Sequence, residues 1–225
     1  RGANGVILIT TKSGRKNSDL SIELDTFFGI QNSSRTMDLM GTVDYAAYTN
    51  EIRSNKIKDN TLGTYVNWQQ KVFDYAPIVS TNLSASGGTS NLSYAASVSY
   101  LYQDGIVGLS KSNFNRLTSR FKIDYDISDN LKLNTAFIYT HSTKNNLPEN
   151  GIGSVLYNAI NMGPTIPVYN TSNYDAISNP QSFTFVKLIN AIEIINPVAQ
   201  MYNASNTSLV DKYSASFGVD YSPSK

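Results

Sequence analysis

A segment near the middle of the chain constrains the fold most, because its residues alternate strictly between two kinds. In the segment Asn115 to Ile127, large apolar residues occupy every second position from Leu117 on, with Ser119 as the one interruption, and polar or charged residues lie between them. A period of two places successive side chains on opposite faces of a β-strand. The segment therefore predicts a strand with one apolar face and one charged face.

Other segments also predict strands, most of them with the same alternation. They cover residues 20–30, 78–86, 92–102, 131–140 and 213–221. The run Val6 to Thr11 differs, because it is continuously apolar, rich in β-branched residues and bounded by glycines. Such a run is typical of a short strand that is buried on both faces.

The predicted strands are joined by connections that alternate in length. Residues 31–77, 103–113 and 141–211 form the longer connections, and residues 87–91 and 128–130 form tight ones. Hairpin strands place successive connections at opposite ends of a sheet. One end therefore carries the tight turns, and the other, which we call the elaborated end, carries the longer connections. Outer-membrane barrels of bacteria have this asymmetry. Within the long connections, short helices are expected at residues 42–55, 68–76 and 154–162.

Composition fits a sheet that is wet on one face and apolar on the other. The 225 residues include 15 tyrosines and only 16% charged residues, whereas soluble domains carry about 25%. A net charge of +1 argues against nucleic acid as the main partner. Two-faced strands also build soluble β-sandwiches, so a surface or secreted glycan-binding adhesin of that class remains the alternative.

Several motifs resemble the SusC/RagA family of TonB-linked outer-membrane proteins. The opening Arg1 to Gly14 is similar to the last strand of that family's plug domain. The segment Trp68 to Ile78 resembles its tryptophan-containing segment, and residues 84–105 resemble its first barrel hairpin. An Asn-Arg pair at 115–116 then opens a strand, as it does in the family.

The resemblance implies an internal fragment of a plugged barrel. The expected fold class is all-β, with about six strands of a 22-stranded antiparallel transmembrane barrel. Residues 1–18 would end the plug domain, and residues 19–225 would form the N-terminal part of the barrel. The chain would lack the TonB box, most of the plug and most barrel strands, so alone in water it should aggregate or stay molten.

The family resemblance also implies a function and a set of partners. It predicts TonB-dependent import of a large nutrient, an oligosaccharide or an oligopeptide, across the outer membrane. The expected partners are a SusD-like surface lipoprotein, the TonB-ExbB-ExbD system and outer-membrane lipid. The chain is not expected to be an enzyme or to bind a cofactor or metal. His141 is the only histidine and cysteine is absent, which leaves no catalytic constellation.

Two groups of residues are candidates for a functional site. Substrate binding in the elaborated loops calls for aromatic rings and amides, which are offered by Tyr157, Asn158, Asn161, Tyr169 and Tyr174. Trp68 offers a ring as well, but packing of its own short helix is the expected role. Charges that face a watery lumen are expected at Arg116, Arg120, Lys122, Asp124 and Asp126. For these charges, pairing with the plug or with each other is expected rather than substrate contact.

Overall fold

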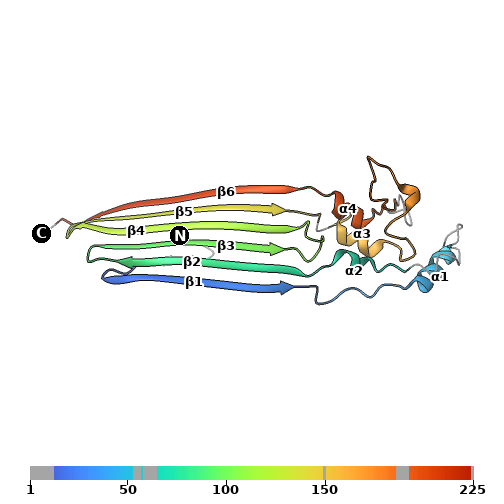
Figure 1. Ribbon diagram of the computed structural model, residues 1–225, viewed down its shortest axis with the longest axis horizontal. Helices are drawn as coiled ribbons and strands as arrows, with labels where there is room; N and C mark the ends of the chain where they lie inside the picture. Colours follow the sequence, from blue (N-terminus) through green and yellow to red (C-terminus); the bar gives the residue numbers. More distant parts are fainter. Residues whose placement is uncertain (1–12, 53–56, 58–64, 149–150, 186–192, 224–225) are drawn as a thin grey trace, which may run out of the picture.

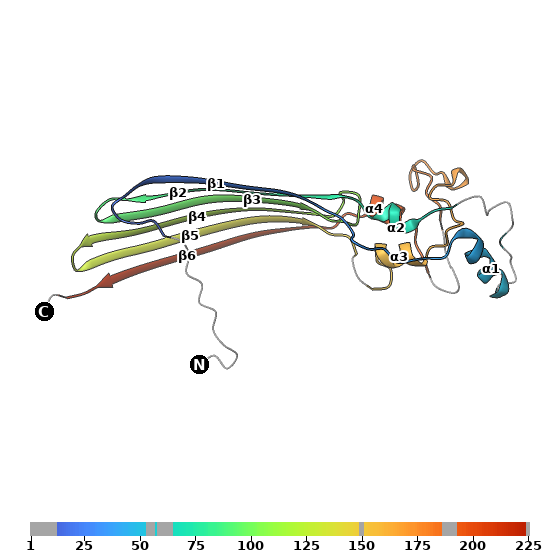
Figure 2. The same cartoon turned by 90° about the horizontal axis from the view of Figure 1, so that it is seen from below.

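The computed structural model describes residues 13–52, 57, 65–148, 151–185 and 193–223. In this part of the chain, six antiparallel strands form one sheet, and short helices and loops gather at one end of it (Figures 1 and 2). Strand order in the sheet follows chain order. The strands are β1 (Ser18–Gln31), β2 (Ala76–Gly88), β3 (Leu92–Asp104), β4 (Asn113–Ser128), β5 (Leu131–Asn145) and β6 (Thr207–Tyr221).

All six strands predicted for the sheet are present, and each is longer than predicted. The largest extension is in β6, which begins at Thr207 and not at Tyr213. The continuous run at residues 6–11 lies outside the described residues. The predicted fold class, a partial antiparallel barrel wall, is confirmed at the level of these six strands.

The alternation of connection lengths is also confirmed. Residues 89–91 join β2 to β3, and residues 129–130 join β4 to β5, at the same end of the sheet. These neighbouring turns are tied to other strand ends, since Asp126 N–H donates to the Asn91 carbonyl over 2.8 Å and Ser222 N–H to that of Asn130 over 2.9 Å. The longer connections all emerge at the opposite end (Figure 1).

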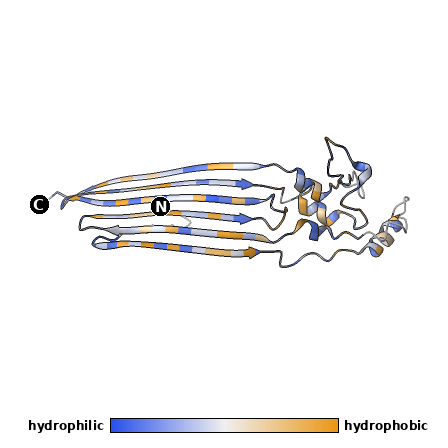
Figure 3. Cartoon of the chain, viewed as in Figure 1, coloured by the Kyte–Doolittle hydropathy of each residue, from blue (hydrophilic) through white to orange (hydrophobic). Residues whose placement is uncertain are grey.

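The register gives the sheet two chemically different faces. Directly paired residues point to the same side, so the pairs Leu24–Leu83 and Phe121–Phe137 belong to one surface. We call this surface the apolar face. Arg120 and Lys122 lie on the other side, which we call the charged face. Figure 3 shows the resulting alternation of apolar and polar residues along each strand.

Among the residues that the structure describes, none forms a second layer over the apolar face. Phe28 is 65% exposed, Phe137 45% and Phe217 73%. A soluble protein rarely leaves so many large apolar side chains in one continuous patch, so this face requires a cover. The main polar exception is near the elaborated end. There His141 Nδ1 lies 2.8 Å from Asp211 Oδ1, and the Tyr139 hydroxyl donates to the same oxygen over 2.8 Å.

The longer connections build a separate unit, which we call the loop body (the described parts of residues 32–75, 105–112 and 146–206). It contains helices α1 (Thr42–Ile52), α2 (Trp68–Val72), α3 (Val155–Asn161) and α4 (Pro197–Asn203), and a short 3₁₀ turn, η2 (Thr171–Asn173). Helices α2, α3 and α4 cluster beside the sheet end, and α1 lies farther out (Figure 2). No helix in the described residues is long and apolar enough to cross a membrane.

One helix prediction needs correction, and one helix was missed. The helix predicted at 68–76 ends at Val72, because Phe73 forms an isolated β-bridge with Val107 and Ala76 already begins β2. Helix α4 was not predicted. Its N-terminus is set by Asn196, whose side chain accepts from the backbone N–H groups of Val198 and Ala199, and by Pro197 at the first helical position.

The loop body holds the main buried apolar core of the described chain. Its centre joins the three clustered helices to the segments beside them, and comprises Trp68, Val72, Leu147, Val155, Ala159, Met162, Ile194 and Met201. Trp68 is 2% exposed and donates its indole N–H to the Gly163 carbonyl over 3.0 Å. Packing was the expected role of this tryptophan, and the loop body is therefore a compact unit rather than a set of free loops.

Candidate functional site

The predicted lumen charges share one face of the sheet. Arg116, Arg120, Lys122, Asp124 and Asp126 alternate along β4, and every one of them points to the charged face. Lys122 Nζ lies 3.7 Å from Asp124 Oδ2, a pair with partly exposed side chains that contributes little stability by itself. Their role as lumen charges stays a prediction.

The segment that leads into β1 lies across this charged face. Lys122 donates to the Ser13 hydroxyl over 2.6 Å, and Lys16 forms an ion pair with Asp126. Gly14 comes so close to the backbone carbonyls of Tyr94 and Gly87 that a side chain there would overlap them. A close approach of two backbones is a position that glycine alone fits. The charges of β4 therefore hold the junction between residues 13 and 17.

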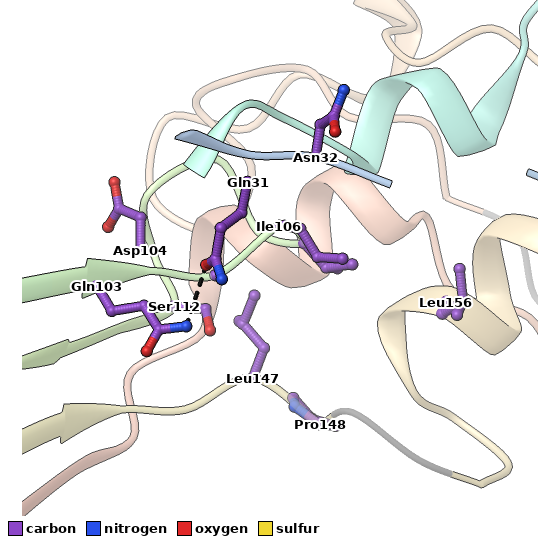
Figure 4. A pocket seen from close by; sticks show the side chains of 11 residues that line it. Gln31, Asn32, Gln103, Asp104, Ile106, Ser112, Leu147, Pro148 and Leu156 are labelled. Atoms are coloured by element: carbon purple, nitrogen blue, oxygen red, sulfur yellow. Dashed lines mark hydrogen bonds between the residues drawn. The ribbon is translucent and has the colours of Figure 1, made fainter. Parts of the chain in front are cut away.

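At the other end of the sheet, a hollow of about 500 Å³ opens between the strand ends and the loop body. We call it the mouth hollow; its main walls are Gln31, Gln103, Ile106, Leu147 and Leu156. The register puts both glutamines on the charged face. Figure 4 shows their side chains on one side of the strands, with Leu147 next to them.

The walls of the mouth hollow are held in place by backbone contacts. The turn between β3 and β4 is fixed to the end of α2, since Asp74 N–H donates to the Ile106 carbonyl over 3.0 Å and Gly108 N–H to that of Val72 over 3.1 Å. Gly108 has a φ of +119° and its α-carbon faces the Leu147 side chain, so a residue with a side chain would be strained there. The hollow is thus pre-formed.

A second hollow, of about 560 Å³, lies within the loop body near α1 and α3. We call it the helix hollow. Its lining combines the rings of Tyr45, Tyr48 and Tyr65 with the amide of Asn161, above the buried Trp68. Aromatic and amide groups together can bind uncharged polar ligands.

The five predicted substrate-binding residues have different surroundings in the structure. Asn158 is completely buried, and its amide nitrogen donates to Gln200 Oε1 over 2.8 Å and to the Gly153 carbonyl over 3.3 Å. It fixes α3 against α4, so it is not available to a substrate. Tyr157 is partly buried against the same core. Asn161 lines the helix hollow and also donates to the Tyr157 carbonyl over 2.9 Å.

Tyr169 and Tyr174 are displayed at the surface. Tyr169 is 58% exposed and stacks on Phe183 with ring centroids 5.4 Å apart, and Tyr174 is 61% exposed. The turn after Tyr174 is fixed by Asp175, whose carboxylate accepts from the backbone N–H of Ser178 over 2.6 Å. Hydrogen bonds from the backbone and hydroxyl of Ser178 and from the backbone of Ile177 lower the pKa of Asp175 below its ordinary value of 3.8. Both rings could contact a ligand, but neither lines the mouth hollow or the helix hollow.

Gln31 and Gln103 were missed by sequence reasoning. Both are polar residues at strand ends, which is an ordinary place for them. Their meeting depends on the pairing of β1, β2 and β3, and no local pattern gives that pairing. The available signal was their parity, since both fall on the side of the strand opposite to the large apolar residues.

Comparison with known proteins explains this combination of sheet and loop body. No family model matches the sequence. The chain is 30% identical, in an alignment of 229 positions that covers 98% of its length, to the TonB-dependent receptor P3 of Formosa agariphila. It is also 30% identical over 185 residues, 82% of its length, to the TonB-dependent receptor SusC of Bacteroides thetaiotaomicron. The chain belongs to the SusC/RagA family of TonB-dependent receptors.

This SusC/RagA-type chain covers only part of its relatives. It spans 21% of the Formosa receptor and 17% of SusC, about a fifth of their length. Among solved structures, it matches the RagAB peptide importer in its open-open state over its whole length and over 28% of that chain. The TM-score is 0.75 and the identity 17%, which supports the fold alone. The resemblance inferred from the motifs is confirmed, and the β-sandwich adhesin is not favoured.

Proposed function

We propose that the protein containing this SusC/RagA-type segment imports a large nutrient across the bacterial outer membrane by TonB-dependent transport. The observation that carries the proposal is the 30% identity along nearly the whole chain to a TonB-dependent receptor. The nutrient would be an oligosaccharide or an oligopeptide. A SusD-like lipoprotein would act as the lid, and the TonB-ExbB-ExbD system would supply energy.

In this proposal the six strands are part of a barrel wall, with lipid on the apolar face. Tyr139 and Tyr213 stack with ring centroids 4.9 Å apart where the apolar part of β5 and β6 meets the polar His141–Asp211 pair, and Tyr221 pairs with Leu131 at the other end. Eight residues separate Leu131 from Tyr139 along β5, which is about 27 Å of strand. At a tilt of about 40° this spans about 21 Å, close to the roughly 25 Å apolar band between the aromatic girdles of such barrels.

The charged face would then line the lumen, and residues 1–18 would end the plug inside it. Support comes from Ser13 and Lys16, which contact Lys122 and Asp126 on that face. Residues 19–225 would be the N-terminal part of the barrel. The loop body would stand outside the cell, and Asn161, Tyr169 and Tyr174 remain candidates for contact with the substrate.

The first test is the location of the intact protein. Cells that express it should be fractionated, and the protein should be recovered with the outer membrane, resistant to extraction by salt and alkali. Recovery in the soluble fraction would overturn the proposal.

The second test addresses energy coupling. Uptake of labelled oligopeptides and oligosaccharides should be compared in cells with and without TonB, with and without the lid lipoprotein. Uptake should require both. Uptake that is equal in cells lacking TonB would show a passive pore and contradict active import.

A further inference from the structure

The helix hollow is built by segments that are distant in the sequence and meet at one turn of the chain. Tyr45 of α1 packs against Gly163, since a Cβ at that position would overlap its ring. Trp68 donates its indole N–H to the Gly163 carbonyl over 3.0 Å, and Val66 N–H donates to the Pro164 carbonyl over 3.0 Å. Helix α1 and the start of α2 are therefore both held at the turn 163–164.

The segment that leads into α1 is fixed to α2 by one side chain. The amide of Gln69, a residue that is 3% exposed, accepts from the Met37 N–H over 2.9 Å and donates to the Met37 carbonyl over 2.8 Å. Both polar groups of this amide thus hold one backbone position. Asp38, the next residue, is thereby placed in the lining of the helix hollow.

The lining combines three tyrosine rings with a single charge. Tyr45 and Tyr48 are three residues apart on α1, so they share one face of the helix, and Tyr65 lines the hollow from another segment. Tyr48 is 50% exposed and Tyr65 59%, so a ligand can reach both rings. Among the described lining residues, Asp38 is the only charged one.

Asp38 changes the preference that the rings and amides alone would give. Rings and amides suit uncharged polar ligands, but the faces of aromatic rings also attract cations. A carboxylate adds attraction for a cation and repels an anion. The three ion pairs of the described part of the chain do not involve Asp38, so none of them neutralises its charge.

We propose that the helix hollow binds a protonated amine of the ligand. The Asp38 carboxylate would form the ion pair, and the rings of Tyr48 and Tyr65 would be the cation–π partners. A hollow of about 560 Å³ admits the amine together with part of the molecule that carries it, and ligand sites commonly measure about 300–1,000 Å³. Amino sugars and lysine side chains both carry this group. The inference rests on the proposed import function and adds selection for positive charge to it.

The test compares ligands that differ only in the amine. The full-length receptor with its lid lipoprotein is purified in detergent, and binding is measured by titration calorimetry at mildly acidic pH, where sugar amines are protonated. One pair is the glucosamine trimer and N,N′,N″-triacetylchitotriose, and the other is Nα-acetyl-lysine-amide and its Nε-acetylated form. In at least one pair the free amine should bind about tenfold or more tightly than the acetylated form. The pair that shows the difference identifies the source of the amine.

A change of charge at Asp38 tests the ion pair. Asp38→Asn keeps the shape of the side chain and removes its charge, so it should weaken binding of the amine by about threefold to fivefold. Asp44→Asn is the matched control, because it makes the same chemical change at an exposed position of α1 that does not line the hollow. It should leave binding of the amine unchanged.

Two substitutions of Tyr48 test the ring. Tyr48→Phe keeps an aromatic face and should preserve binding of the amine. Tyr48→Leu keeps an apolar side chain without that face, and it should weaken binding by about threefold. Equal losses in the two variants would contradict the cation–π contact.

Two further outcomes would overturn the inference. These are equal binding of the free and acetylated forms in both pairs, and equal effects of Asp38→Asn and Asp44→Asn. Failure here leaves the import function standing if uptake still requires TonB. Conversely, charge-selective binding without TonB-dependent uptake would overturn import and not the amine site.

Discussion

The sheet and the loop body are made by one chain, yet they handle apolar side chains in opposite ways. In the loop body, Val72 and Val155 are fully buried around Trp68, as in a soluble domain. In the sheet, large residues such as Phe28 and Phe217 stay mostly exposed, and the strands are joined by their hydrogen-bond ladders. The loop body therefore carries its own solvent shield, whereas the apolar face depends on its surroundings.

The stability of the loop body thus depends on its own packing, whereas the stability of the sheet depends on what surrounds the apolar face. A core residue matters in the loop body because its neighbours pack against it. On the apolar face, under the proposed cover of lipid, a side chain would matter through its polarity, since lipid is a poor solvent for charge. Substitutions should therefore follow two different rules within a short stretch of sequence.

Removal of the central ring should cause the largest effect. Trp68→Ala should destabilise the loop body by about 3–5 kcal/mol, because it removes a buried ring and leaves a cavity. The measurement is limited proteolysis of the full-length receptor on intact cells in increasing urea. Tyr75→Ala, at a residue that is 71% exposed, is the control and should change little. If Trp68→Ala also abolished membrane insertion, the two regions would not be independent.

A charge on the apolar face should have the next largest effect. Thr135 lies midway between Leu131 and Tyr139 on that face. Thr135→Arg should destabilise the barrel by about 2–4 kcal/mol, the cost of a cation near the bilayer midplane. Asn134→Arg is the control, because this neighbour points to the charged face, where it pairs with Asp124. Urea unfolding of the full-length receptor in lipid vesicles measures both, and equal losses would contradict the assignment of faces.

A smaller effect is expected from the loss of a buried amide, which can be compared with the loss of a less buried amide on the same helix, α3. Asn158→Ala should cost about 1–3 kcal/mol, because the Gln200 oxygen and the Ile195 N–H lose a buried partner. Asn161→Ala, which breaks one hydrogen bond to the Tyr157 carbonyl, should cost about 0.5–1.5 kcal/mol. The proteolysis assay in urea compares them. A larger loss for Asn161→Ala would reverse their structural roles.

The smallest effect concerns acid and the turn after Tyr174. Because hydrogen bonds from Ser178 lower the pKa of Asp175 in the folded turn, the stabilisation is present above the ordinary value of 3.8 and is lost as pH falls through the lower folded pKa. Hydrogen exchange of the Ser178 amide should therefore speed up in strong acid, after correction for the intrinsic exchange rate. In Asp175→Asn this extra acceleration should be absent; if it persists, another group is responsible.

The sequence also predicts the sheet better than it predicts the loop body. Alternation is a local pattern, so it located most of the six strands. It failed where a polar residue lies on the apolar face. Asp211 interrupts the pattern of β6, and the prediction therefore began at Tyr213. The interruption is tolerated because His141, opposite it on β5, and Tyr139 hydrogen-bond its carboxylate. A partner seventy positions away gives no local signal.

The loop body was harder to predict for a related reason. Its helices are short and are held by contacts between distant segments, as when Trp68 donates to the Gly163 carbonyl. Helix α4 did have a signal, an Asn-Pro pair at 196–197 that caps and begins it. The mouth hollow had none, since Gln31 and Gln103 come together only through the strand order.

The two-residue and three-residue turns have a consequence for how such a receptor diversifies. Because β2–β3 and β4–β5 close so tightly, the entry and exit points of the loop body all lie at one end of a fixed wall. Insertions, deletions and exchanges between relatives can accumulate there without shifting the strand register. The wall is therefore a fixed frame, and a loop body from another receptor could be grafted between residues 31 and 76, 104 and 113, and 145 and 207.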